Sequence, residues 1–278
     1  MRRLSQAWQL ELVKQLEGGT EGIVFSAVSE ADGSPLVLKV GLPDSLSAEH
    51  AFLKAAQGRG VANLLQYDAQ APALLLEQLG DKLHDTSLTS TQQREILCDA
   101  LIELWRQPLD QLDELMTGAQ RARWHSDFVS ENWDKYAADQ NPDVGRQALE
   151  YAELCEARFD ASDSVLVHGD AHPWNALVCP SGGYSLVDPD GVWGEPAIDL
   201  GVLMREWADE LLAAEDVAQA ALTRCAELAN YSGVSALAVW QWGYLEHTST
   251  ALVCAQIGET TWAEQHMSIA TALVGYSP

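Results

Sequence analysis

The hydrophobic pattern changes near Gly80, and this change limits the fold more than any other feature of the chain. Before Gly80, short runs rich in Val, Leu and Ile are bounded by turn residues, which predicts strands. Ser47 precedes one helical stretch, which runs to about Ala56 between the third and fourth runs. After Gly80, apolar residues recur at the three- and four-residue spacing of helices. The expected strands are 11–16, 23–28, 36–40, 61–67 and 73–78.

The second part of the chain is therefore expected to be mostly helical. One compact block at 165–190 interrupts it and contains three short predicted strands, at 165–167, 176–178 and 185–187. The pattern as a whole predicts an α+β fold in two lobes, 1–78 and 79–278, the first a small antiparallel sheet with one helix. The expected helices of the larger lobe are 91–105, 119–138, 144–159, 199–212, 216–231, 235–257 and 260–273.

The charge of the chain lies mainly in this second part. The formal net charge is −25, and residues 1–78 contribute −3 of it, from 6 Lys and Arg against 9 Asp and Glu. Nucleic acid and anionic membranes are excluded as partners, because both need a basic surface. A cationic small molecule would be attracted, although a solubilising surface explains the charge equally well.

The cysteines and the apolar runs bear on the compartment. The 5 cysteines are scattered and never form a C-x-x-C pair, which favours reduced thiols over a disulfide framework. No signal-peptide core follows Met1, and no apolar run is long enough to span a bilayer. We therefore expect a cytoplasmic protein.

The segment from Val165 to Asn175 contains the pattern most indicative of chemistry. It reads V-L-V-H-G-D-A-H-P-W-N, and Asp188 follows 13 residues after Asn175 at the end of an apolar run. A strand, an H-x-D-x-x-x-x-N loop, a hairpin and an exposed aspartate are typical of kinases. Asp170 can accept the proton of an attacking hydroxyl, and Asn175 and Asp188 offer oxygen ligands for Mg²⁺. The alternative is that these are turn and capping residues.

Three segments together resemble the signature of the aminoglycoside phosphotransferases. They are H-G-D-A-H-P-W-N at 168–175, V-D-P-D-G at 187–191 and G-E-P-A-I-D-L at 194–200. The last two are most similar to the streptomycin 6-kinase and hydroxyurea kinase branch. The resemblance implies a protein-kinase-like fold that uses ATP and Mg²⁺. It also implies Asp170 as the catalytic base, Asn175 and Asp188 as metal ligands, His168 as a structural residue and Asp199 as a brace of the loop.

The N-terminal lobe fits the same interpretation. A kinase needs a lysine on its third strand and a glutamate on the next helix, and Lys39 and Glu49 occupy these places. The glycine segment 18–22 lies where a phosphate-covering loop would be. Gly19 and Thr20 are candidate backbone donors, although the segment lacks G-x-G-x-x-G and suits a plain hairpin turn equally well.

The segment 74–80 resembles the lobe hinge of a kinase, where backbone groups bind the purine. The candidate residues of this segment are Glu77 and Leu79. The segment is compatible with binding of GTP as well as of ATP. Carboxylates that could contact a cationic acceptor, and tryptophans that could stack on it, form a second set. These candidates are Asp190, Glu195, Glu246, Trp193 and Trp174, whereas Trp240, Trp242 and His247 are expected to pack in the core.

The sequence thus predicts a kinase that transfers the ATP γ-phosphoryl group to a hydroxyl of a cationic, aminoglycoside-like acceptor. Three alternatives stay open. The first is a kinase of another hydroxylated metabolite, such as a sugar, an amino alcohol or hydroxyurea. The second is a pseudokinase that binds nucleotide without catalysis. The third is a metallohydrolase using His168, Asp170, His172 and Asp188, which Pro173 after the second histidine disfavours.

Overall fold

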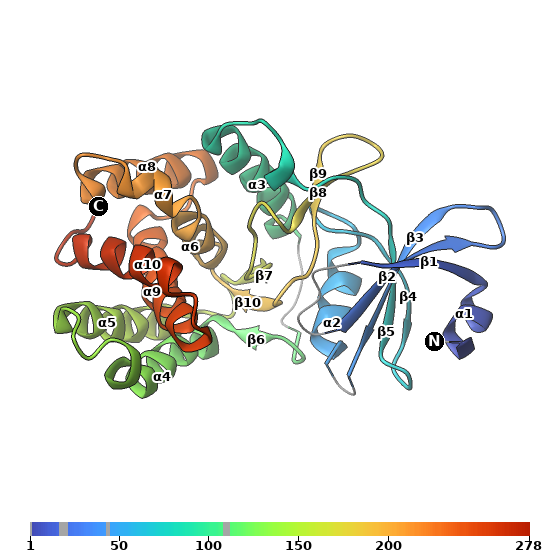
Figure 1. Ribbon diagram of the computed structural model, residues 1–278, viewed down its shortest axis with the longest axis horizontal. Helices are drawn as coiled ribbons and strands as arrows, with labels where there is room; N and C mark the ends of the chain where they lie inside the picture. Colours follow the sequence, from blue (N-terminus) through green and yellow to red (C-terminus); the bar gives the residue numbers. More distant parts are fainter. Residues whose placement is uncertain (1, 17–21, 43–44, 108–111) are drawn as a thin grey trace.

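The computed structural model describes residues 2–16, 22–42, 45–107 and 112–278, and Figure 1 shows a sheet-containing lobe beside a larger helical one. The sheet of the first lobe is antiparallel throughout, with strand order β1-β2-β3-β5-β4. Its strands are β1 (Leu10–Leu16), β2 (Gly22–Ser29), β3 (Pro35–Gly41), β4 (Leu64–Asp68) and β5 (Ala73–Glu77).

Helices cover both faces of this sheet. Because side chains alternate along a strand, Leu36 and Leu38 of β3 point to one face and Lys39 to the other. The leucine face packs against Leu4 of α1 (Arg2–Trp8). The opposite face packs against α2 (Ser47–Ala56), whose Phe52 belongs to the main core. The sequence predicted one helix in this lobe. It missed α1, which has 7 residues and is too short to show a helical period.

The larger lobe is built from helices around two small sheets. One sheet has the order β6-β10-β7 and the other is the hairpin β8-β9. The strands are β6 (Met116–Thr117), β7 (Val165–Val167), β8 (Ala176–Val178), β9 (Tyr184–Leu186) and β10 (Val192–Gly194). The helices are η1 (Leu83–Asp85), α3 (Ser90–Trp105), α4 (Gly118–Tyr136), α5 (Pro142–Arg158), α6 (Ala197–Arg205), α7 (Ala208–Leu212), α8 (Val217–Ser232), α9 (Ala236–Ile257) and α10 (Thr260–Ala272).

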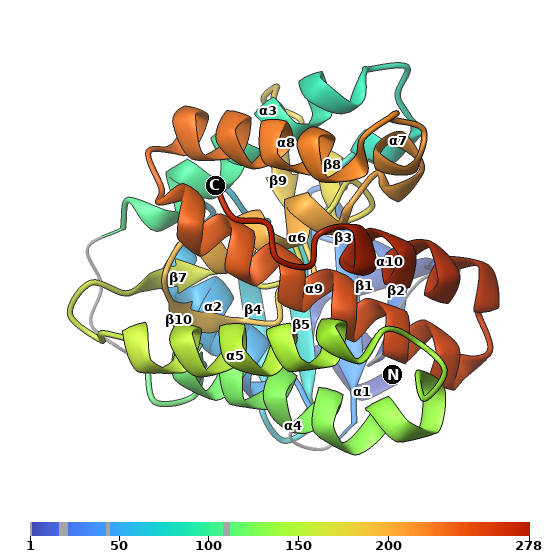
Figure 2. The ribbon, with the colours of Figure 1, turned by 90° about the vertical axis from the view of Figure 1, so that its left-hand side faces the viewer.

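Helix α9 forms the centre of this lobe. Figure 2 shows it between α5 on one side and α8 on the other, with α10 alongside. Every residue from Ala238 to Ser249 is buried, as expected of a helix whose middle part has no solvent face. Trp240, Trp242 and His247 lie in the core, with exposures of 1%, 1% and 0%, as predicted.

A break between α6 and α7 replaces the single helix predicted over 199–212. Trp207 has a φ of +54°, which ends the helical path. Arg224 of α8 compensates for the break, because its guanidinium donates to the carbonyl oxygens of Met204 at 3.1 Å, Glu206 at 2.5 Å and Trp207 at 3.3 Å. The carbonyl oxygens at the break thus find their hydrogen-bond donor in a side chain from a distant helix. The periodicity of the local sequence could not indicate this contact. The break leaves Arg205 at the end of α6.

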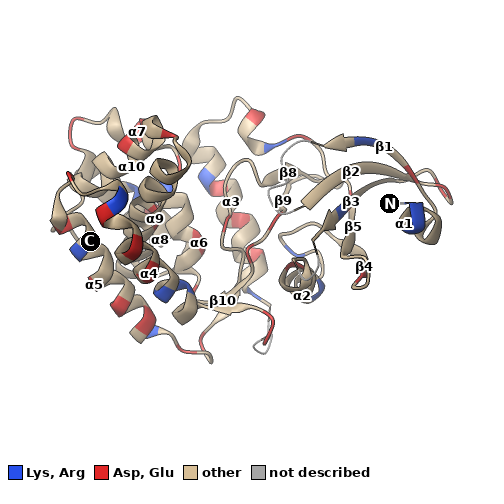
Figure 3. Ribbon diagram, turned by 60° about the horizontal axis from the view of Figure 1, so that its bottom comes forward, with Lys and Arg blue, Asp and Glu red and all other residues tan. Residues whose placement is uncertain are grey.

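The acidic positions of the larger lobe are distributed over its helices, with basic positions among them (Figure 3). They do not gather on one face in this view. Among the helices that the structure describes, none combines the length and the apolar character that crossing a bilayer would need.

Candidate active site

The loop between β7 and β8 holds the predicted base, and a buried carboxylate braces it. The fully buried Asp199 accepts hydrogen bonds from the backbone N–H of His168 at 3.1 Å and of Gly169 at 2.7 Å. Trp105 Nε1 donates to it at 2.9 Å. Burial raises the pKa of Asp199 to about 6, so the carboxyl is ionised at neutral pH.

His168 connects this loop to the end of β9. Its Nε2 lies 3.1 Å from the carbonyl oxygen of Val187, and the backbone N–H of Asp170 donates to its Nδ1 at 3.3 Å. Burial lowers the pKa of His168 to about 4, so the ring is neutral, with its proton on Nε2. The geometry gives His168 the supporting place that the resemblance implied.

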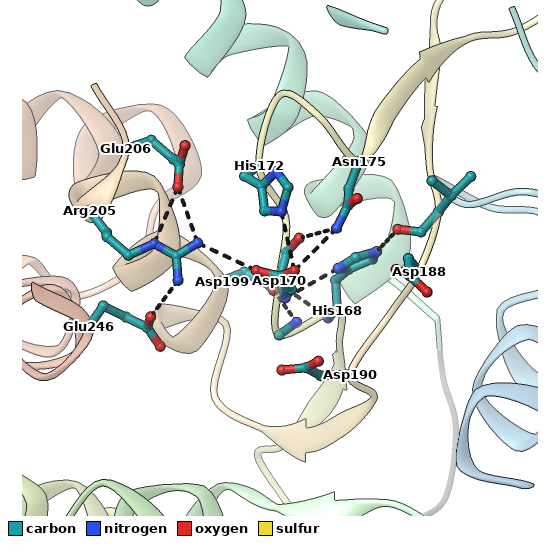
Figure 4. A network of polar contacts seen from close by, with 12 residues as sticks. His168, Asp170, His172, Asn175, Asp188, Asp190, Asp199, Arg205, Glu206 and Glu246 are labelled. Atoms are coloured by element: carbon teal, nitrogen blue, oxygen red, sulfur yellow. Dashed lines mark hydrogen bonds and ion pairs between the residues drawn. The ribbon is translucent and has the colours of Figure 1, made fainter. Parts of the chain in front are cut away.

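Both carboxylate oxygens of Asp170 have neighbours (Figure 4). His172 Nε2 and Asn175 Nδ2 each lie 3.2 Å from Oδ2, and Arg205 Nη2 lies 3.4 Å from Oδ1. Although burial raises the pKa of Asp170, His172 and Arg205 lower it well below its ordinary value. The carboxylate is therefore ionised, and about a third of its side chain is exposed. Because Asn175 directs its amide nitrogen to Asp170, its carbonyl oxygen faces the other way.

Lys39 joins the two lobes at this site. Its Nζ lies 2.7 Å from Glu49 Oε2 and also pairs with Asp188 Oδ1. The side chains of Lys39 and Glu49 are each 7% exposed, whereas that of Asp188 is 42% exposed. Although burial lowers the pKa of Lys39, the two carboxylates raise it above its ordinary value. The structure thus brings together three predicted residues from three separate elements.

The backbone of Asp188 has a conformation that is unusual for its residue type. Its φ is +60°, in the left-handed region that side chains other than those of Gly, Asn and Asp rarely adopt. This turn directs one carboxylate oxygen at Lys39 and leaves the other for a ligand. Asp188 and the carbonyl oxygen of Asn175 are hard donors of the kind that Mg²⁺ takes alongside phosphate oxygens and water. The residues present therefore fit a magnesium ion.

The predicted hinge residues lie at the lobe junction. The Glu77 carboxylate accepts from the backbone and side-chain nitrogens of Asn63 at 2.7 and 2.8 Å, so its side chain is already used. Leu79 is 8% exposed, and the N–H of Gly80 donates to Val178 at 2.7 Å. Gly19 and Thr20 lie outside the described residues.

A cluster of charged side chains from α4, α6, α9 and the segment after β9 lies beside Asp170. Arg121 Nη1 lies 3.0 Å from Asp190 Oδ2, and Arg205 Nη1 lies 3.0 Å from Glu246 Oε2. Arg121 Nη2 is 3.6 Å from Glu246 Oε1, and His125 Nε2 is 3.5 Å from the same oxygen. Although burial raises the pKa of Glu246, His125 and the arginines lower it to about 2. The sequence analysis named Asp190 and Glu246 but missed the arginines, since neither lies in a motif.

Two other predicted acceptor contacts lie elsewhere. Trp193 is 2% exposed and donates to the carbonyl oxygen of Ala161 at 3.3 Å, so it presents no face on which a substrate could stack. Glu195 pairs with Arg158 at 2.8 Å and accepts from Trp242 Nε1 at 2.7 Å, beside a cavity of about 230 Å³. Trp193 of β10 is thus part of the core, and the carboxylate of Glu195, one residue after β10, is bound by Arg158 and Trp242.

Trp174 is an exposed tryptophan of the loop between β7 and β8. The residue is 47% exposed, and its ring stacks on His84 with centroids 3.5 Å apart. Lys82 Nζ lies 5.2 Å from the centre of the same ring. The loop thereby packs against the segment that follows the hinge.

Comparison with known proteins agrees with this geometry. The family model for the aminoglycoside/hydroxyurea antibiotic resistance kinases matches residues 8–258. The chain belongs to this family. It is therefore a small-molecule phosphotransferase, and the predicted branch is confirmed. The family match leaves the metallohydrolase alternative without support.

Two curated relatives belong to the same branch. A streptomycin 6-kinase of Streptomyces glaucescens is 23% identical over 99% of this chain and 89% of its own length. A hydroxyurea phosphotransferase of Kitasatospora aureofaciens is 30% identical over 70% of this chain, and the match spans 57% of that relative. These relatives differ in the acceptor for which they are named.

Solved structures confirm the predicted protein-kinase-like fold. A choline kinase from Streptococcus pneumoniae has a TM-score of 0.67 at 16% identity, covering 99% of this chain and 97% of its own. An aminoglycoside phosphotransferase from Streptomyces rimosus, solved with ADP and streptomycin, has a TM-score of 0.57 at 18% identity. That match covers 88% of this chain and 96% of the other. At these identities the likeness shows the fold alone.

Proposed function

We propose that the protein transfers the γ-phosphoryl group of ATP to a hydroxyl of a small cationic acceptor, with an aminoglycoside such as streptomycin as the first candidate. The observation that carries the proposal is the convergence of Lys39, Asp188 and Asp170 from the two lobes (Figure 4 shows the latter two). A lysine held by a buried glutamate, a free carboxylate oxygen and an ionised base are the parts that phosphoryl transfer needs.

Each residue has one role in this proposal. Lys39 contacts the α- and β-phosphates, and Glu49 holds its ammonium group in place. Asp188 and Asn175 hold Mg²⁺, which neutralises charge on the triphosphate when it is bound. Asp170 accepts a hydrogen bond from the acceptor hydroxyl and orients its oxygen towards the phosphorus atom. Glu77 and Leu79 offer backbone groups to the purine, and ATP and GTP both suit such contacts.

The charges around Asp170 favour a cationic acceptor. Carboxylates of Asp170, Asp190, Glu206 and Glu246 meet the guanidinium groups of Arg121 and Arg205. The carboxylates exceed the guanidiniums, so an acceptor that brings ammonium or guanidinium groups would balance the site. The relative named streptomycin 6-kinase is consistent with this chemistry.

A small uncharged acceptor is the second candidate. Arg121 and Arg205 already pair with Asp190 and Glu246, which reduces the negative charge that the acceptor itself must balance. The 30% identical relative named hydroxyurea phosphotransferase fits this alternative. An N-hydroxy group presents the same oxygen nucleophile to Asp170 as an alcohol does.

An acceptor screen tests the proposal. The purified protein is incubated with Mg²⁺ and either ATP or GTP, and ADP or GDP release is followed with streptomycin, other aminoglycosides, choline, neutral sugars and hydroxyurea. We expect release to depend on a cationic acceptor and the phosphorylated product to appear by mass spectrometry. The Asp170→Asn variant is the control for contaminating kinases. Turnover with hydroxyurea alone would select the second candidate, and nucleotide binding without turnover of any acceptor would contradict both.

A further inference from the structure

We propose that Arg205 is a positioning residue of the transfer reaction, which fixes the Asp170 carboxylate, and that the buried Glu246 holds Arg205 in this place. The inference rests on the proposed function, because it assigns a further role at the same site. Neither Arg205 nor its contact with the base follows from the motif at 168–175. One chain of charged contacts runs from Glu246 of α9 through Arg205 to Asp170 in the loop between β7 and β8.

Arg205 contacts the oxygen of Asp170 that the catalytic loop leaves free. His172 and Asn175 both lie against Oδ2, whereas Arg205 Nη2 lies 3.4 Å from Oδ1. Without Arg205, Oδ1 would lose the one hydrogen-bond donor that contacts it among the described residues. Since an acceptor hydroxyl has to meet this oxygen in one orientation, small rotations of the carboxylate would misplace the nucleophile.

The position of Arg205 is set by its other contacts. Its Nη1 lies 3.0 Å from Glu246 Oε2, and its Nε and Nη2 donate to Glu206 Oε1 at 3.2 and 3.1 Å. Glu246 is 3% exposed, so its charge is hardly screened by water. Figure 4 shows the guanidinium between Glu246, Glu206 and Asp170, with a different side of the group facing each of them. The guanidinium has little freedom to rotate.

The break that ends α6 makes this placement available. Arg224 takes the carbonyl oxygens that α6 leaves free at its end, which stabilises the chain where it turns after Arg205. A helix continuing through Trp207 would carry the side chain along a different path. Three elements, α6, α8 and α9, therefore contribute to one contact with the base.

The neighbours of Asp170 come from several elements, and Arg205 is the one that fixes the carboxylate. Arg205 carries a permanent positive charge, because a guanidinium group does not lose its proton in proteins. The other groups that interact with the base are His168, His172 and Asn175 on its own loop and Asp190 on the following segment. Arg121 of α4 contacts Asp190, and Glu246 of α9 contacts Arg205.

Kinetics of Arg205 variants test the role. In Arg205→Met we expect kcat to fall by about 10- to 100-fold while KM for the nucleotide changes by less than about twofold. Arg205→Lys should recover part of the loss, because it restores the cation but not the fork of donors. Arg158→Met is the matched control: Arg158 also holds a glutamate, Glu195, at 2.8 Å, and its contacts are with Glu195, Gln241 and Cys155 instead of Asp170. The control should keep kcat near wild type.

A double-mutant cycle keeps the test independent of the acceptor. The free energy of unfolding in urea is measured for wild type, Asp170→Asn, Arg205→Met and the double variant. We expect the Asp170 substitution to cost more stability when Arg205 is present. Additive effects, or a wild-type kcat in Arg205→Met, would overturn the inference. If wild type turns over no acceptor, the proposed function fails, while the cycle still decides whether Arg205 holds Asp170.

Discussion

Replacing Lys39 by methionine is the perturbation whose size can be worked out most closely. Methionine has a similar volume, so the change removes the ammonium group while leaving the packing nearly intact. Glu49, which is 6% exposed, then loses a cation that lies 2.7 Å away. Removing one partner of a buried ion pair costs about 3–5 kcal/mol. The pair with Asp188 adds little, since that side chain is 42% exposed.

Protonation of Glu49 sets an upper limit on this cost. At pH 7, protonating a glutamate of ordinary pKa, about 4.3, costs about 3.7 kcal/mol, so the destabilisation cannot exceed this by much. At pH 5 the same limit is about 1 kcal/mol. In the variant, folding favours the protonated carboxyl. The free energy of unfolding of Lys39→Met is therefore largest below about pH 4.3 and decreases as the pH rises.

Equilibrium urea denaturation at pH 7 and pH 5 measures both values. We expect Lys39→Met to lose about 3–4 kcal/mol of unfolding free energy at pH 7 and about 1 kcal/mol at pH 5. The double variant Lys39→Met with Glu49→Gln should recover most of the loss at pH 7. A destabilisation that is equal at the two pH values, or that the second substitution leaves unchanged, would refute the reasoning.

Three further predictions concern the catalytic loop and the metal. Gly169→Ala should destabilise the protein by more than about 1 kcal/mol and lower turnover, because φ is +85° and the new Cβ would lie 2.9 Å from Asp190 Cβ. Gly182→Ala, with φ of +93° and nothing within 4 Å, is its control for backbone strain alone and should keep normal turnover. The pKa of Asp199 is raised from 3.8 to about 6, so wild type should lose unfolding free energy relative to Asp199→Asn as the pH rises from about 4 to about 6. Urea denaturation measures this difference, and a difference that stays constant over this pH range would contradict the prediction. Asp188→Ala should weaken binding of the nucleotide in the presence of Mg²⁺ far more than in its absence, by calorimetry, and equal affinities would count against the metal role.

Much of the fold could be predicted because local patterns determine it. In the strand that contains Lys39, side chains alternate, so the leucines lie on one face and the lysine on the other. Glu49 was predictable as the partner of Lys39 because it lies on the helix that follows this strand. The catalytic loop lies between two short apolar strands and carries its functional residues within 8 positions, so sequence spacing alone brings Asp170 and Asn175 together.

The rest depends on contacts between distant parts of the chain. Arg205 and Glu246 lie 41 residues apart and meet because α6 packs on α9. The break after Arg205 depends on Arg224, from a helix that local periodicity treats as separate. Glu195 was a candidate contact to a cationic acceptor, yet its carboxylate pairs with Arg158, 37 residues earlier in the chain. Such pairings carry no signal in the spacing of a single sequence.

The most direct test of Asp170 as the catalytic base is a single-turnover measurement. It follows transfer of the γ-phosphoryl group from ATP to the acceptor found in the screen. Wild type and Asp170→Ala are compared under saturating acceptor, with nucleotide affinity measured in parallel. We predict a rate lower by about 10²- to 10⁴-fold in the variant, with nucleotide affinity nearly unchanged. A variant that transfers phosphate at close to the wild-type rate would contradict the assignment of the base.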